Sequence, residues 1–145
     1  MKFSDIKKDQ WADLQPYLDT CLVPLTGLTG GEEPWEVTQA LERLADIMEP
    51  VEIPFKGRVV TYPSLHYNGQ PGSFVAGVNH LCGKLREGGF AYVILISADP
   101  AISIMSFEGA DLFLSAEDAS GGKALIGEKL QEVWRREKEK LTKDA

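Results

Sequence analysis

The sequence predicts a single-domain α/β protein in which a mostly parallel sheet lies between two layers of helices. Three observations support this fold class. Apolar runs alternate with amphipathic helical stripes, turn-forming residues separate them, and the length suits one domain. The chain has 145 residues, of which 43% are hydrophobic and 26% charged, so it can bury one core. We therefore predict one three-layer α/β/α domain over residues 1–145.

The beginning of the chain predicts a short broken helix followed by a buried strand. Asp5 and Asp13 are typical N-cap residues and place helical turns over residues 4–19. Residues 21–25 are apolar without alternation, as in a strand covered on both faces. Pro24 lacks the N–H of a ladder hydrogen bond, so we expect it near an edge or a bulge.

Two strand–helix–strand units follow, which implies parallel strands with right-handed crossovers. The first helix begins at Pro34, and Val37 belongs to its apolar stripe. The second helix ends at Gly88 and Gly89, one of which we expect to cap it with a positive φ. Residues 90–97 are rich in Val and Ile and predict a fully buried strand.

The end of the chain predicts a hairpin and a C-terminal helix. Residues 102–107 and 111–115 are separated by three residues that include Gly109, which is typical of an antiparallel hairpin at a sheet edge. Residues 123–143 carry one apolar stripe, so we expect this helix to dock on the sheet with its charged side in water.

Charge and composition exclude several classes of protein. The 22 acidic residues outnumber the 15 basic ones, giving a net charge of −7, whereas a nucleic-acid binder needs a basic surface. The two cysteines lack a Cys-x-x-Cys spacing and indicate a reducing compartment. Neither a membrane-spanning run nor a secretion signal is present. We therefore expect a cytoplasmic protein without a nucleic-acid partner or a membrane span.

No motif predicts catalysis or a cofactor. The glycine-rich turn at residues 27–31 matches neither the dinucleotide nor the P-loop spacing, and the acidic pair Glu32 and Glu33 after it disfavours phosphate. Ser73 lacks the second glycine of a nucleophile elbow. We expect a protein that acts by binding a protein or a small molecule, and the sequence leaves a homo-oligomer open.

Loops that follow parallel strands share one sheet edge, where open α/β sheets bind ligands. The loops at residues 26–33, 63–72 and 98–101 contain polar residues that packing does not require. Their acidic members favour a cation or a basic group, and a histidine would make binding vary between about pH 5 and 8. The candidate ligand-binding residues are Thr26, Glu32, His66, Asn68, Ser97 and Asp99.

The same edge allows an alternative function, that of a divergent metal-dependent hydrolase. One histidine and several carboxylates can hold zinc or manganese. No pair of histidines at helical spacing fixes two ligands on one element, however, so our first interpretation includes no metal. The residues of the alternative are Glu32, Glu33, His66 and Asp99.

Several fragments resemble one family when their order is considered. They are residues 19–25, residues 55–58, Pro63 with Tyr67, residues 89–90 and residues 97–99. In this order they resemble the YpiF-like family, short uncharacterised proteins of spore-forming bacteria, over nearly the whole chain. The resemblance implies a cytosolic bacterial protein and implies nothing about its chemistry.

Residues 23–27, 70–73 and 89–90 are also similar to the frame of creatininase-type metal-dependent amidohydrolases. The metal-binding parts of that family do not match. No Glu-x-His-Gly follows Gly27, and residues 97–100 stand where its histidine loop would be. This second resemblance implies a similar scaffold without the metals.

Overall fold

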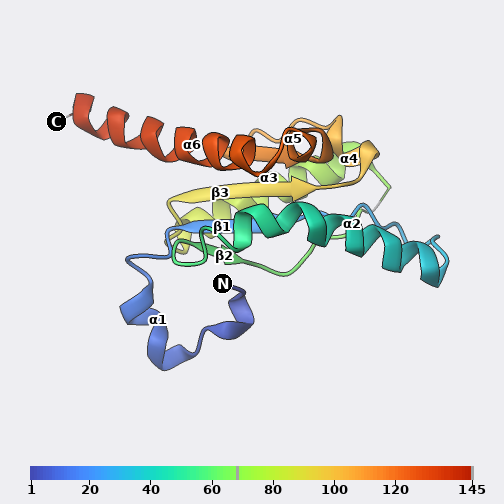
Figure 1. Ribbon diagram of the computed structural model, residues 1–145, viewed down its shortest axis with the longest axis horizontal. Helices are drawn as coiled ribbons and strands as arrows, with labels where there is room; N and C mark the ends of the chain where they lie inside the picture. The colour runs from blue at the N-terminus through green and yellow to red at the C-terminus, as the bar shows by residue number, and fades with distance from the viewer. Residues whose placement is uncertain (68, 145) are drawn as a thin grey trace.

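Four parallel strands form one sheet in the order β2-β1-β3-β4, and every crossover between them includes a helix (Figure 1). The computed structural model describes residues 1–67 and 69–144, with side chains described up to residue 136. The elements are η1 (Phe3–Asp5), α1 (Lys8–Leu14), β1 (Thr20–Pro24), α2 (Pro34–Glu52), β2 (Val59–Thr61), α3 (Pro71–Glu87), β3 (Tyr92–Ser97), α4 (Pro100–Ser103), β4 (Leu112–Ser115), α5 (Ala116–Ser120) and α6 (Lys123–Asp144).

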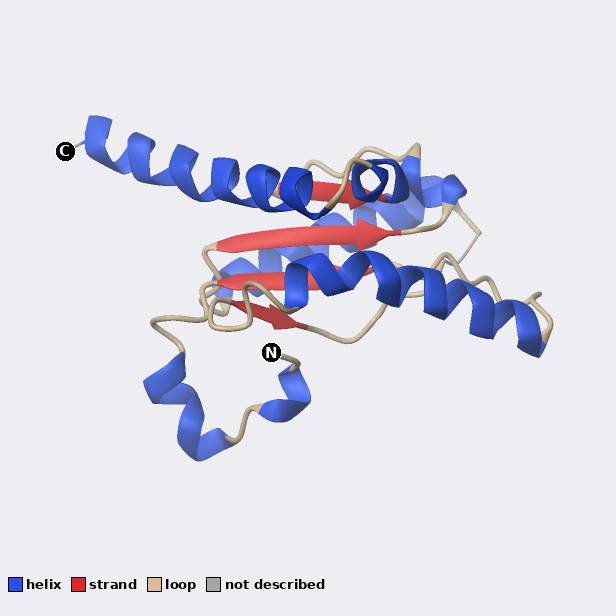
Figure 2. Ribbon diagram, viewed as in Figure 1, coloured by secondary structure: helices blue, strands red, loops and turns tan. Residues whose placement is uncertain are grey.

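Helices cover both faces of the sheet, which confirms the predicted three-layer α/β fold (Figure 2). Leu22 and Ile94 lie on the face covered by α2 and α6. Val23 and Leu95 lie on the opposite face with α1, α3 and α4. Successive side chains of a strand point to opposite faces, so each strand contributes to both cores.

The strand predicted over residues 90–97 is β3, and all six of its residues are buried. β3 lies between β1 and β4 and has helices on both faces, which explains its continuous apolar sequence. The chain enters this strand through Gly89, whose φ of +117° is the left-handed conformation that we predicted for one residue of the glycine pair.

Pro24 does not lie at an edge, because β1 lies inside the sheet between β2 and β3. The pairing beside it is irregular in the manner of the expected bulge, since Leu22 pairs with Thr61 and Leu25 with Leu65, which leaves one extra residue on the β2 side. The N–H of Leu25 donates to the carbonyl of Ile96 on β3, at 2.8 Å. Successive N–H groups of a strand point in alternate directions, so the nitrogen of Pro24 faces the β2 side. β2 has already ended there, at Thr61, and the sheet needs no donor at this position.

The predicted hairpin at one edge is also wrong. Residues 102–107 begin inside α4, and residues 111–115 contain β4, which pairs parallel to β3. Asp99 starts the helix, since its Oδ1 accepts hydrogen bonds from the N–H groups of Ala101 and Ile102, at 2.8 and 3.3 Å. This N-cap and the proline after it turn an apolar sequence into a helical crossover.

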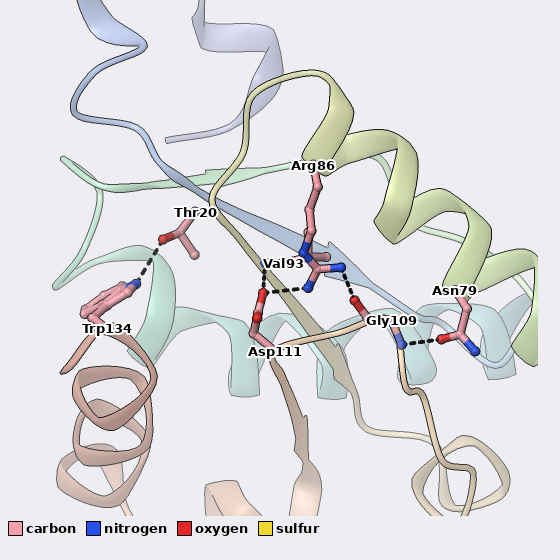
Figure 3. Close-up of polar contacts among 7 residues, drawn as sticks. All are labelled: Thr20, Asn79, Arg86, Val93, Gly109, Asp111 and Trp134. Atoms are coloured by element: carbon pink, nitrogen blue, oxygen red, sulfur yellow. Dashed lines mark hydrogen bonds and ion pairs between the residues drawn. The ribbon is translucent and has the colours of Figure 1, made fainter. Parts of the chain in front are cut away.

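Side chains of α3 hold the turn that precedes β4 (Figure 3). Arg86 donates to the carbonyl of Gly109 and, at 2.8 Å, to Oδ2 of Asp111. Asn79 Oδ1 accepts from the N–H of Gly109 at 2.8 Å. A β-carbon on Gly109 would lie 2.9 Å from Asn79 Cα, so glycine permits a close approach to α3 here. The same Asp111 oxygen accepts from the N–H of Val93 at 2.8 Å and closes the end of the ladder.

α6 docks across the start of β1, as the apolar stripe predicts. Trp134 is buried, and its Nε1–H donates to Thr20 Oγ1 at 3.0 Å (Figure 3). The guanidinium of Arg58 lies 3.9 Å from the centre of the Trp134 ring and donates to both carboxylate oxygens of Asp19, at 3.0 and 3.2 Å. These contacts tie the last helix to the amino end of the sheet.

Candidate functional site

The carboxyl ends of the four strands lie at one edge of the sheet (Figure 2). The strand order reverses between β1 and β3, because the chain passes from β1 to β2 and then returns over β1 to β3. At such a point the loops after the two strands leave toward opposite faces, and open α/β sheets bind ligands between them. The candidate residues of the sequence therefore lie at an edge of the right kind.

Thr26 and His66 meet at this edge although they are 40 residues apart. The N–H of Thr26 donates to the carbonyl of Leu65 at 2.9 Å, which extends the pairing beyond β1. Thr26 Oγ1 lies 2.8 Å from His66 Nδ1 and accepts from the N–H of Leu28 at 3.1 Å. The loops after β1 and β2 are thus joined by backbone hydrogen bonds and by the hydroxyl group of Thr26.

The hydroxyl of Thr26 has one proton for two neighbours. It lies 3.2 Å from the carbonyl of Leu65 and 2.8 Å from His66 Nδ1. If the proton goes to the carbonyl, Nδ1–H of His66 donates to Thr26 and Nε2 is the acceptor of the neutral ring. If the proton goes to Nδ1, Nε2 carries the ring hydrogen. In both cases Nδ1 is occupied by Thr26, and Nε2 is the nitrogen that can serve a ligand.

Glu32 closes the glycine-rich turn after β1. Its Oε1 accepts from the N–H and the hydroxyl of Thr29, at 2.8 and 3.1 Å, and its Oε2 accepts from the N–H of Gly30 at 2.9 Å. These hydrogen bonds, above all the one from the Thr29 N–H, lower the pKa of Glu32. The N–H groups that a phosphate would need already hold a carboxylate.

Glu32 and His66 line one pocket of about 420 Å³. Its apolar walls come from Leu28, Val37 and Tyr67. The pocket therefore combines an ionised carboxylate, a histidine and an apolar surface. This is the mixture of few polar groups on apolar walls that small-molecule sites have.

Asp99 and Ser97 do not line this pocket and lie beside it. Ser97 is fully buried, and its Oγ accepts from the N–H of Asp99 at 3.2 Å. Asp99 and Thr26 line a much smaller recess, of about 40 Å³, with Arg43. Gly27 leaves room for this carboxylate, since a β-carbon there would lie 2.4 Å from Asp99 Oδ2. Thr26 lies between the two recesses, and Asp99 mainly caps α4.

The remaining candidates do not join this group. Asn68 lies outside the described residues. Glu33 is the N-cap residue of α2, and its N–H donates to Glu36 Oε1 at 3.0 Å. Within the described part of the chain, no three His, Cys, Asp or Glu side chains are arranged to hold a metal ion. The ligand set of the alternative hydrolase, Glu32 with Glu33, His66 and Asp99, is therefore not assembled.

Sequence reasoning missed the apolar walls of the pocket. The apolar stripe of its helix predicts a buried Val37, but the first turns of α2 extend past the edge of the sheet (Figure 1). The same extension leaves Trp35 62% exposed. Tyr67 directly follows His66 in the sequence, and this position is a signal that could have identified it as a pocket residue.

Comparisons with known proteins identify the family of the chain and do not identify an activity. A family model described as "Protein of unknown function (DUF2487)" matches residues 9–115, which is more than half of the chain, so the chain belongs to this family. Searches among curated proteins and among solved structures found no significant match. The finer resemblances to YpiF-like proteins and to creatininase-type enzymes stay predictions. In the described part of the chain, every helix is too short or too polar to cross a membrane.

Proposed function

We propose that this member of the DUF2487 family is a non-catalytic binding protein of the cytoplasm. Its ligand would be a small molecule with a basic group, held in the pocket that Glu32 and His66 line. The observation that supports this proposal best is the ionised carboxylate of Glu32 beside apolar walls. The alternative ligand is a protein partner that inserts a basic side chain into the same pocket.

The carboxylate of Glu32 accepts hydrogen bonds from its own turn. Oε1 accepts from the N–H and the hydroxyl of Thr29, and Oε2 accepts from the N–H of Gly30. The N–H of Glu32 itself also acts on the carboxylate. Because the pKa of Glu32 is lowered, the group keeps its charge in mildly acidic solution as well as at neutral pH. An ammonium group supplies both the donor and the opposite charge.

The rest of the pocket favours an apolar body on the ligand. Leu28 and Val37 offer aliphatic surface, and Tyr67 offers a ring that packs on Phe74 with centroids 5.0 Å apart. His66 Nε2 can take part as a donor or an acceptor, because Thr26 holds Nδ1. We therefore expect an amine on an aromatic or aliphatic frame.

The proposal is tested with a pair of probes that differ in charge alone, phenethylamine and 2-phenylethanol. NMR titration of the ¹⁵N-labelled chain should show the amine shifting the signals of Thr29, Gly30 and Tyr67 more strongly than the alcohol. In Glu32→Gln this preference should fall by about fivefold, the scale of one exposed charge pair. The amide oxygen of Gln can keep the bonds from Thr29, whereas its NH2 group cannot accept from the N–H of Gly30.

Glu128→Gln is the matched control, because it removes the same charge from the exposed side of α6. It should leave the preference for the amine unchanged. Equal binding of the two probes, or an unchanged preference in Glu32→Gln, would overturn the proposal.

A further inference from the structure

A groove of about 300 Å³ lies between the N-terminal segment and the β2 edge of the sheet, separate from the pocket at the carboxyl end. Phe3 and Trp11 form one wall, and Tyr62 and Phe90 form the other. Figure 1 shows the N-terminal segment, in blue, as an arm beside β2. The two walls therefore come from parts of the chain that are far apart in sequence.

The four aromatic rings contact one another in series along the groove. The ring centres are 6.4 Å apart for Phe3 and Tyr62, 5.3 Å for Tyr62 and Phe90, and 6.1 Å for Phe90 and Trp11. Phe3 is 47% exposed, so an aromatic surface remains uncovered at the end of the series. Edge-to-face and offset contacts with such rings favour a further aromatic group over an alkyl chain of the same area.

The charge of the groove is opposite to that of the molecule. The described charged residues that line it are Lys7 and Lys8, in a chain whose net charge is −7. Asp5 of the same arm accepts a hydrogen bond from the N–H of Lys2 and does not line the groove. The two ammonium groups therefore favour an anionic group at the mouth of an aromatic groove.

We propose that this groove binds a free aromatic carboxylic acid, with its ring against the exposed surface of the aromatic series and its carboxylate at Lys7 and Lys8. The volume is at the lower end of small-molecule pockets and suits one or two fused rings with a short acidic side chain. A lipid acyl chain would be longer than the groove and would make no use of its aromatic faces. This site would recognise acids, whereas the pocket at the carboxyl end recognises bases.

Indole-3-propionate and its neutral amide, indole-3-propionamide, are the probes. NMR titration of the full chain should place the shifts of the acid on residues 3–11 and on Val60 and Phe90. The acid should bind about fivefold to tenfold more tightly than the amide, the scale of one or two exposed charge pairs. Its affinity should fall as salt is added, because exposed charges are screened.

Two variants separate the aromatic from the charged contribution. Lys7→Gln/Lys8→Gln should abolish the preference for the acid, while Lys84→Gln/Lys123→Gln, which removes two exposed lysines elsewhere, should keep it. Phe3→Ala should lower the affinity for the acid and for the amide alike, by about threefold or more, because it removes the exposed aromatic wall. Thermal melts show whether each variant is folded.

The proposal is overturned if the acid does not shift the signals of the arm, if the acid and the amide bind equally, or if the double lysine variant keeps the preference for the acid. Decanoate is the aliphatic counterpart, and tighter binding of decanoate than of indole-3-propionate would contradict an aromatic ligand. Shifts at Thr29 and Gly30 in place of the arm would assign the acid to the other pocket.

Discussion

The two ends of the sheet use polar side chains differently. At the amino end, hydrogen bonds join elements that are far apart in the chain, as between Thr20 and Trp134, 114 residues apart. At the carboxyl end, Glu32 and Asp99 accept from N–H groups two or three residues away and shape their own loops. The contact of Thr26 with His66 is the long-range bond among the candidate residues at that end.

We expect this difference to separate stability from the ligand binding proposed for the Glu32 pocket. Bonds between distant elements hold the layers together, so their loss lowers the free energy of unfolding of the whole domain. Bonds within one loop hold that loop, so their loss changes a local surface. We therefore expect loss of the buried long-range contacts of Trp134 to destabilise the domain most, and substitution of the Glu32 side chain to change ligand binding.

The largest expected effect comes from Trp134→Ala, at the amino end. It empties a buried site under Arg58 and removes the bond to Thr20, so the free energy of unfolding should fall by about 3–5 kcal/mol. Urea unfolding followed by circular dichroism measures it. Trp134→Phe keeps one ring of the indole and should cost less, about 1–3 kcal/mol, from the lost hydrogen bond and the missing second ring. Equal costs for the two variants would show that packing at this site is unimportant.

Gly27→Ala tests the carboxyl end through the backbone. Gly27 has a φ of +77°, and a β-carbon would meet the carboxylate of Asp99. The free energy of unfolding of the variant should therefore be lower by about 1–3 kcal/mol. A β-carbon on Gly27 would also lie 2.6 Å from Asp99 Cβ, so the matching background is Asp99→Gly, in which the steric part should disappear and the cost of Gly27→Ala should be smaller. Additive costs in this double-mutant cycle would mean that the two residues do not interact.

Arg86→Met breaks the clamp between α3 and the turn before β4. Arg86 and Asp111 are 35% and 31% exposed, so solvent screening weakens their ion pair. We expect the free energy of unfolding to fall by about 0.5–1 kcal/mol. The loss should shrink at high salt. Lys84→Met, which breaks the more exposed pair with Glu87, should cost less in the same thermal melts.

The smallest effect is the titration of Glu32. Its pKa is lowered from the ordinary value of 4.5, chiefly by the N–H of Thr29. Because the pKa is lower in the folded protein, the ionised carboxylate stabilises the fold at pH values above the pKa of the unfolded chain. This contribution is lost as the pH falls through the pKa of the folded protein. Carbon-13 NMR should find the midpoint below 4.5, and Thr29→Ala should raise it by removing the hydroxyl donor.

Much of the fold could be predicted because local patterns decide it. The apolar sequence of β3 follows from cover on both faces, and the cap at Gly89 follows from a backbone conformation that glycine adopts easily. The place of the site was also predictable, because parallel strands bring their carboxyl ends together. This topology alone puts Thr26, Glu32 and His66 near one another.

Strand pairing decided the parts that could not be predicted. The position of Pro24 depends on where its neighbour β2 ends, and the turn before β4 is held by Arg86 and Asn79, which lie on another element. The wall formed by Val37 depends on how far α2 extends past the sheet. Each of these features depends on how two separate segments pack together, so the sequence pattern of either segment alone cannot predict it.

The bond between Thr20 and Trp134 also has a consequence for folding during synthesis. At about 5–20 residues per second, a ribosome needs roughly 6–23 seconds to pass from one residue to the other. Until α6 is made, the sheet face that contains Ile94 lacks one of its two covering helices. A nascent chain of this protein therefore has to remain partly open for seconds, in the interval when aggregation and chaperone binding compete with folding.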